Sequence, residues 1–242
     1  MNVNTEKKSE NSFFRFIDNY WYHHKWATIG ITFALIVILI CTLQMCEGEK
    51  EDLSVVYAGP DSFMVGDRLT NIHAALKTVL SEDYNGDGTK HVEWISYYVM
   101  SDEEIKYHQS EAEKIGEEYY YNSAVISENL KNFQNIIVSG EYSLCFLSPY
   151  LYEMVKRENG FTPLSEIFDE VPDSSADEYS ILLSETEFGK YFPGISELPE
   201  DTVICLRRVG GIGALLRKSK NEKENAQSAE LFRAIVAFKA EE

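Results

Sequence analysis

The apolar residues of this chain follow two patterns, and the first is an unbroken run. Residues 27–45 contain 19 residues without a charge. At a rise of about 1.5 Å per residue, a helix of this length reaches roughly the 30 Å thickness of the hydrocarbon core of a bilayer. The run therefore predicts a transmembrane helix over 27–46, preceded by a tail over 1–26 and followed by a charged linker over 47–52.

The residues before the run predict its orientation. Aromatic residues that favour the membrane interface precede it directly, namely Tyr20, Trp21, Tyr22 and Trp26. Arg15 and Lys25 lie on the same side, whereas the twenty residues after the run contain only Lys50. Because positive charge favours the cytoplasmic side, the tail is predicted to lie in the cytoplasm and residues 53–242 outside it.

The run has three other interpretations. A cleaved signal peptide has a shorter apolar region and a small-residue cleavage site, and neither is found here. Lipidation at Cys46 has a leucine at the correct offset in LQMC, but Met45 stands where a small residue is preferred. A buried helix of a soluble protein is the third. The uncleaved anchor is the preferred interpretation.

The second pattern alternates short strand-like runs with amphipathic stretches. Strands are predicted over 53–59, 91–100, 141–147, 179–183 and 202–206, and helices over 65–79, 101–121, 127–140, 149–159 and 228–238. Ser127 and Ser148 are expected N-caps, Pro149 a first helical residue and Gly140 a C-terminal stop. This alternation predicts an α/β domain with a mixed sheet and helical crossovers over 53–242.

The charge narrows the choice of partners. The chain has 22 Lys and Arg residues against 40 Asp and Glu residues. Residues 1–46 hold four of the basic and three of the acidic residues, which leaves 18 against 37 in the remainder. A domain this acidic repels nucleic acid and anionic lipid, and cations or basic surfaces are the expected partners.

Two cysteines fall in the predicted outer domain. Cys145 and Cys205 each lie in a strand-like run, SLCFL and VICLR. A disulfide between neighbouring strands is one interpretation. Two buried thiols that behave as small hydrophobic side chains is the preferred one.

One candidate metal loop stands out. Asp83, Asn85 and Asp87 precede Gly88 as the first ligands of a calcium loop would. The twelfth position, which should offer a carboxylate, is Trp94. Calcium is therefore weighed against a tight turn built from residues that tolerate positive φ, and the turn is preferred.

A basic stretch runs against the overall charge. It comprises Arg207, Arg208, Arg217, Lys218 and Lys220, with no acidic residue between them. Arg217 and Lys218 are candidates for docking on an acidic partner, and a solvated loop is the preferred alternative. The GGIG sequence at 210–213 lacks the spacing of a phosphate-binding loop.

Signatures of catalysis are missing from the sequence. The outer domain has three histidines (His73, His91 and His108), with no HExxH motif, no zinc-spaced cysteine pair and no GxSxG motif. The sequence therefore predicts a protein that is not an enzyme and needs no cofactor other than the calcium considered above.

Several of these segments together resemble the bacterial extracellular solute-binding proteins of the type II periplasmic-binding class. They are LSVVYAGP, HVEWISYYV, IIVSGEYSLCFLSPYLYEMV and FTPLSEIF. The resemblance implies ligand or partner binding outside the cytoplasm. Ligand contacts in that family come from loops at strand ends, which here are Gly59, Pro60 and Asp61 after the first strand and Ser148 and Pro149 after the third.

The length of the domain departs from that family, whose members have two lobes around a cleft. Residues 53–242 number 190, so an incomplete second lobe is expected. Two functions follow from this. One is a tethered binding module for a small molecule or peptide, and the other is a cell-envelope interaction protein whose shortened fold has no pocket.

Overall fold

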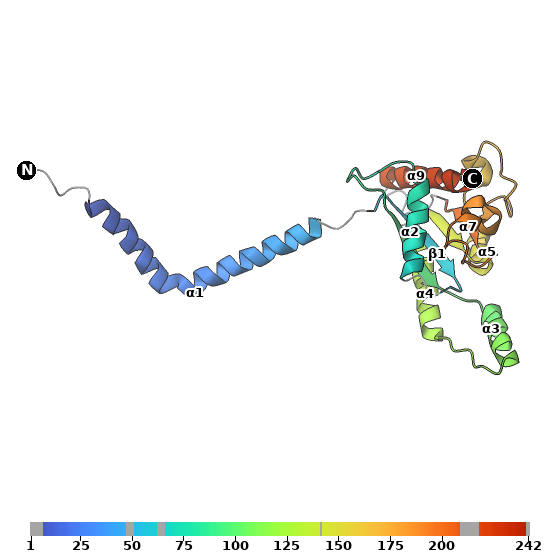
Figure 1. Ribbon diagram of the computed structural model, residues 1–242, viewed down its shortest axis with the longest axis horizontal. Helices are drawn as coiled ribbons and strands as arrows, with labels where there is room; N and C mark the ends of the chain where they lie inside the picture. The colour runs from blue at the N-terminus through green and yellow to red at the C-terminus, as the bar shows by residue number, and fades with distance from the viewer. Residues whose placement is uncertain (1–6, 47–50, 62–65, 141, 209–217, 241–242) are drawn as a thin grey trace, which may run out of the picture. The chain divides into compact units, whose positions relative to one another are not determined.

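The computed structural model describes residues 7–46, 51–61, 66–140, 142–208 and 218–240, with the side chains of all of these except 7–19, 42–46 and 218–221. The chain divides into two compact units, Met1–Glu49 and Lys50–Glu242 (Figure 1). The linker predicted over 47–52 contains the boundary between them, although residues 47–50 lie outside the described ranges.

The first unit is a single helix, α1 (Lys7–Cys46). Its segment Tyr20–Cys41 is long and apolar enough to cross a membrane, and none of that segment is buried inside the protein. The segment begins seven residues before the predicted start at 27, because the interfacial aromatic residues belong to the same helix. Cys46 is the last residue of α1.

The second unit is built around one five-stranded sheet. Its strands are β1 (Leu53–Gly59), β2 (Val92–Tyr98), β3 (Leu144–Leu147), β4 (Ser180–Leu182) and β5 (Val203–Leu206). Their spatial order is β2-β1-β3-β5-β4, with β1 parallel to β2 and β3, and β5 antiparallel to β3 and β4. The predicted α/β class and mixed sheet are confirmed. The described ranges of this unit contain no second sheet that could form another lobe.

Helices cover both faces of the sheet because its strands are apolar on both sides. The side chains of Val55 and Tyr57 pack with α2 (Asp67–Val79) and α9 (Lys218–Ala237), whereas those of Val56 and Ala58 pack with α4 (Ser123–Ser139) and α5 (Pro149–Arg157). Side chains of a strand alternate between the two faces, so β1 supports two separate cores. The C-terminal helix docks on the sheet as predicted, through Leu231, Phe232 and Ile235.

The remaining helices are short or peripheral. They are α3 (Asp102–Lys114), α6 (Leu164–Ile167), the 3-10 helix η1 (Leu183–Glu185) and α7 (Glu187–Tyr191). Helix α3 has no buried residue. It stops before the predicted end at 121, since Gly116 adopts a left-handed φ of 76° just beyond it.

One N-cap prediction is wrong and one helix stop is right. Helix α4 begins at Ser123, and the Asn122 side chain accepts hydrogen bonds from the backbone N–H groups of Ala124 and Val125. Ser127 therefore lies inside the first turns of the helix. Gly140 ends it in the left-handed conformation, as predicted.

Asp177 forms the most highly bonded polar cluster of the described residues. Its carboxylate accepts hydrogen bonds from Tyr152 Oη and Lys156 Nζ, both at 2.7 Å. It also accepts from the backbone N–H groups of Tyr179 and Ser180 and from the Ser180 hydroxyl, at 2.9–3.0 Å. Burial alone would raise the pKa of this carboxyl, but these donors outweigh it and lower the pKa to about 2. The cluster ties the chain before β4 to α5.

The two cysteines of the domain are directly opposite each other on β3 and β5. Both are fully buried free thiols, which is the preferred interpretation of the sequence. Burial raises the pKa of the Cys145 thiol to about 12, so it stays protonated and packs as a hydrophobic side chain.

Candidate functional site

The candidate site lies at the carboxyl edge of the parallel strands. Strands β1, β2 and β3 run in the same direction, so their carboxyl ends meet at one edge of the sheet. From β1 the chain passes to α2 on one face, and from β3 it passes to α5 on the other. Ligands of open α/β sheets bind where neighbouring strands diverge in this way.

Three small residues stand side by side at this edge. Ala58 pairs with Leu147 and Leu147 pairs with Val203, so Gly59, Ser148 and Thr202 occupy the next positions of β1, β3 and the chain entering β5. The Ser148 N–H donates to the carbonyl of Ala58 at 2.9 Å, which holds the end of β3 against β1. We call these three residues, together with Tyr57, Asp61 and Arg68 described below, the edge cluster.

The small residues of the edge cluster face the core formed with α2 and α9. Three residues of the strands point into that core, namely Tyr57, Phe146 and Ile204. Each edge residue lies two positions from one of them in the chain, toward the same edge of the sheet, and side chains two positions apart share a face. A side chain at Gly59 would be too close to its neighbour, since a Cβ atom there would lie 2.7 Å from the Tyr57 hydroxyl oxygen. Glycine is required here by packing.

Two hydroxyl groups of the edge cluster lack partners. Ser148 and Thr202 are each 1% exposed, and neither side-chain oxygen has a hydrogen-bond partner among the described residues. Leaving a buried hydroxyl unsatisfied costs about 1–3 kcal/mol, so buried polar atoms nearly always have a partner in the protein, in water or in a ligand. Ser148 is the N-cap residue of α5 by position, but its side chain makes no capping bond.

An ion pair lies next to the hydroxyl group of Tyr57. Arg68 in the first turn of α2 contacts Asp61, with 2.5 Å from Nη1 to Oδ2, and the two side chains are 17% and 12% exposed. Arg68 Nε lies 3.4 Å from a carboxylate oxygen of Glu197 without hydrogen-bond geometry, and neither Nε nor Nη2 has a hydrogen-bond partner among the described residues. The guanidinium therefore keeps donors available.

Tyr57 connects the ion pair to the sheet. Its hydroxyl oxygen accepts a hydrogen bond from the Asp61 N–H at 3.3 Å. Burial, and then the charge of Asp61, raise the pKa of this phenol well above its usual range. The group stays protonated and can donate its hydrogen.

The structure brings together most of the ligand contacts predicted from the family resemblance. Gly59, Asp61 and Ser148 belong to the edge cluster, Pro60 lies between two of its members, and Pro149 is the exposed first residue of α5. Sequence reasoning missed Tyr57, Arg68 and Thr202. Thr202 had one usable signal, because it opens a predicted strand, but its neighbour across the sheet depends on strand order.

The candidate calcium loop forms a tight turn in the structure. Both oxygens of Asp83 accept backbone N–H bonds, from Gly86 at 2.6 Å and Gly88 at 2.7 Å, where the glycines have φ of 75° and 91°. Asn85 and Asp87 accept from the N–H groups two residues on, at 2.8 Å. The described residues contain no group of three or more potential metal ligands. Calcium binding stays a prediction.

The basic stretch is not one surface. Arg207 is buried and donates to the carbonyls of Tyr142, Gly140 and Arg208 at 2.8–3.0 Å, next to the end of α4. A cation there complements the negative end of the helix dipole. Arg208 forms an ion pair with Glu166 at 3.7 Å. Arg217 lies outside the described residues, and Lys218 is the first residue of α9.

Comparison with known proteins adds no relative. No protein-family model, no curated protein and no solved structure matches the chain.

Proposed function

We propose that this chain is a non-catalytic binding module, anchored in the membrane by α1 and placed outside the cytoplasm, with its ligand site at the edge cluster. The apolar segment Tyr20–Cys41 supports the anchor, and the basic residues before it support the orientation. The fold supports a relationship to the solute-binding proteins that the sequence resembles, since the predicted contact loops meet at one edge of the sheet.

The observation that carries the proposal is the pair of buried hydroxyls without partners. Ser148 and Thr202 lie on neighbouring strand ends, at a place where open α/β sheets bind ligands. A fold that gains nothing from these hydroxyls would place alanine and valine at the same positions. A ligand that bonds to both hydroxyls removes the cost of burying them.

The same observation supports binding without catalysis. A serine or threonine nucleophile needs a base within hydrogen-bond reach to remove its proton. Neither hydroxyl has any hydrogen-bond partner among the described residues, so neither is activated.

The donors of the cluster indicate what the ligand offers. The free positions of Arg68 can only donate, and Ser148, Thr202 and Tyr57 can donate as well. The ligand is therefore a small molecule or peptide that presents several hydrogen-bond acceptors. The two hydroxyls are buried, whereas the side chains of Arg68 and Asp61 are 17% and 12% exposed, so the ion pair is the part of the edge cluster that a ligand reaches from solvent.

A thermal-shift screen tests this proposal. Residues 50–242 form a compact unit with their own core and are screened against sugars, amino acids, oligopeptides, carboxylates and divalent cations including calcium. A ligand that binds only the folded state raises the melting temperature by mass action. The matched control is the S148A/T202V variant, which is expected to lose the shift. A domain that melts cooperatively but responds to no ligand contradicts the proposal and favours the envelope interaction protein.

A further inference from the structure

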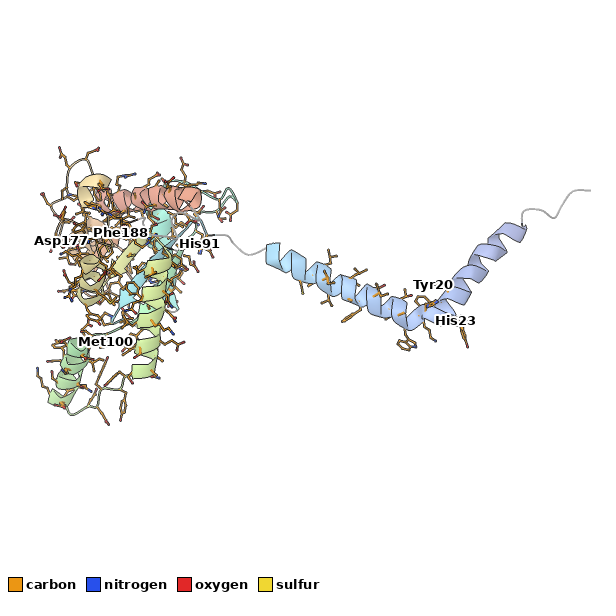
Figure 2. All side chains as sticks on the ribbon, turned by 180° about the vertical axis from the view of Figure 1, so that it is seen from behind. Tyr20, His23, His91, Met100, Asp177 and Phe188 are labelled. Carbon is orange, nitrogen blue, oxygen red and sulfur yellow. The ribbon has the colours of Figure 1, made fainter. Side chains whose placement is uncertain are left out.

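Residues 101–122, which we call the arm, form a folded excursion between β2 and α4. Helix α3 within it has no buried residue, so this helix adds no side chain to the core of the domain. Figure 1 shows α3 standing off from the sheet at the end of its connecting loops. Figure 2 places Met100 where the arm leaves the body of the domain.

The arm nevertheless makes contacts of its own. Ser101 and Glu104 form a capping box, with the two side chains each bonded to the other's backbone N–H at 3.1 and 2.6 Å. The rings of His108 and Tyr119 stack at 5.2 Å, and the Tyr119 hydroxyl reaches the sulfur of Met100 at 3.5 Å. The residues that make these contacts add nothing to the core, so the contacts point to a use outside the fold.

The surface of the arm combines acidic groups with aromatic rings. Residues 101–122 contain two lysines and seven acidic residues, which are Asp102, Glu103, Glu104, Glu111, Glu113, Glu117 and Glu118. Tyr107 is 62% exposed and Tyr120 is 79% exposed, with Ile115 at 72% between them in the sequence. These three side chains belong to one short segment that is exposed along its length, which is where an interaction surface is expected.

The acids lie beside the rings. Glu103 and Glu111 are each one helical turn from Tyr107. The Tyr120 hydroxyl donates to Glu118 at 2.5 Å, which keeps that carboxylate next to the ring. A ring face paired with a carboxylate attracts the side chain of lysine or arginine through both cation–π and ion-pair contacts.

We propose that the arm docks a partner polypeptide through a segment rich in lysine and arginine. This surface is separate from the edge cluster, and the inference goes beyond the proposed ligand site. The occupant is a separate polypeptide, because residues 47–242 of this chain hold 18 basic residues against 37 acidic ones and two copies repel each other overall; self-association is an outcome of the test. An anionic membrane surface is repelled for the same reason.

The test uses the full chain in nanodiscs of neutral lipid, so that the probe does not bind the membrane. A fluorescent peptide of alternating lysine, arginine and glycine is titrated and followed by anisotropy at low and at high salt. We expect saturable binding that weakens with salt. A peptide of the same length with glutamate in place of the basic residues is expected not to bind.

Three double variants separate the effect of the arm from that of the overall negative charge. Y107A/Y120A leaves the charge unchanged and is expected to weaken binding roughly tenfold. E103Q/E118Q is compared with E158Q/E170Q, which removes the same charge at exposed positions outside the arm. The arm pair is expected to weaken binding several times more than its control, and unchanged melting curves confirm that all variants fold.

Four results overturn the inference. One is wild-type affinity in Y107A/Y120A, which means that the rings take no part. Another is an equal loss in the two glutamine variants, which means that the peptide senses only net charge. The third is the absence of peptide binding, and the fourth is a self-association of the chain that Y107A/Y120A abolishes.

Discussion

Two polar clusters of the unit Lys50–Glu242 differ in how completely their hydrogen bonds are made. Asp177 receives bonds from two neighbouring side chains on α5, two backbone N–H groups and the Ser180 hydroxyl. In the edge cluster, the side-chain hydroxyl groups of Ser148 and Thr202 have no hydrogen-bond partner within the described residues. A saturated cluster stabilises the fold, whereas an unsaturated one costs stability and is kept for a reason outside the fold.

The largest effect is expected at the saturated cluster. D177A leaves Tyr152 without its acceptor, leaves Lys156 only the longer contact with Glu153 at 3.4 Å, and frees the chain before β4. Hydrogen bonds to a charged group contribute about 1.5–3 kcal/mol, so we expect a loss of about 3 kcal/mol in the free energy of unfolding. Urea denaturation of residues 50–242 measures it, with D173A at an exposed neighbouring position as the control. An equal, small loss in the free energy of unfolding of both variants would show that the cluster does not stabilise the fold.

The same carboxyl makes stability depend on pH. Its pKa is about 2 in the folded protein, below the ordinary value of 3.8, so the unfolded chain takes up the proton first on acidification. The stabilisation is complete above pH 3.8 and is lost as pH falls through about 2. Between these pH values, the melting temperature of the wild type is expected to fall more steeply with decreasing pH than that of D177N. Parallel declines would contradict the assignment.

The next effect is expected at Gly59. An added methyl group would meet the Tyr57 hydroxyl, and overpacking of this kind costs about 1–3 kcal/mol. We expect G59A to lose about 2 kcal/mol of stability. In a Y57F background the obstructing oxygen is gone, so the cost of G59A should fall by half or more. A double-mutant cycle measures the coupling, and additive losses would mean that another contact excludes the side chain.

The smallest effect has the opposite sign. S148A and T202V each remove a buried hydroxyl that has no partner, and we expect each to raise the stability of the ligand-free domain by about 1 kcal/mol. This corresponds to roughly 2–4 °C in melting temperature for a domain of this size. Ser184 provides the control. Its hydroxyl donates to the carbonyl of Glu200, so S184A should lose stability. Destabilisation by S148A and T202V would mean that ordered water already satisfies the hydroxyls.

Local patterns in the sequence predicted most of the fold. The strand-like runs around β1, β2 and β3, the stop at Gly140 and the start of α5 at Pro149 depend on neighbours in the chain, and each was found. Asn122 was missed as an N-cap because the apolar face of α4 becomes regular only after Ser127, although the helix begins earlier. The apolar segment of α1 was likewise recognised from composition alone.

The candidate site was predicted only in part, because it depends on which strands are neighbours. Ser148 and Gly59 each follow a predicted strand, and the family resemblance pointed to both. Thr202 joins them only because β5 inserts beside β3 in the antiparallel direction. Arg207 shows the converse, since its sequence neighbours suggested an exposed basic stretch and the fold buries it under three carbonyl groups.

The most direct test of the ligand site is a calorimetric titration of the strongest ligand from the thermal-shift screen, with residues 50–242 as wild type and as S148A/T202V. The account predicts saturable binding to the wild type and a loss of affinity of roughly 5- to 150-fold in the variant, since a hydrogen bond missing at each of the two hydroxyls is worth about 0.5–1.5 kcal/mol. Equal affinity for both proteins would contradict the account, because the ligand would then bind away from the edge cluster.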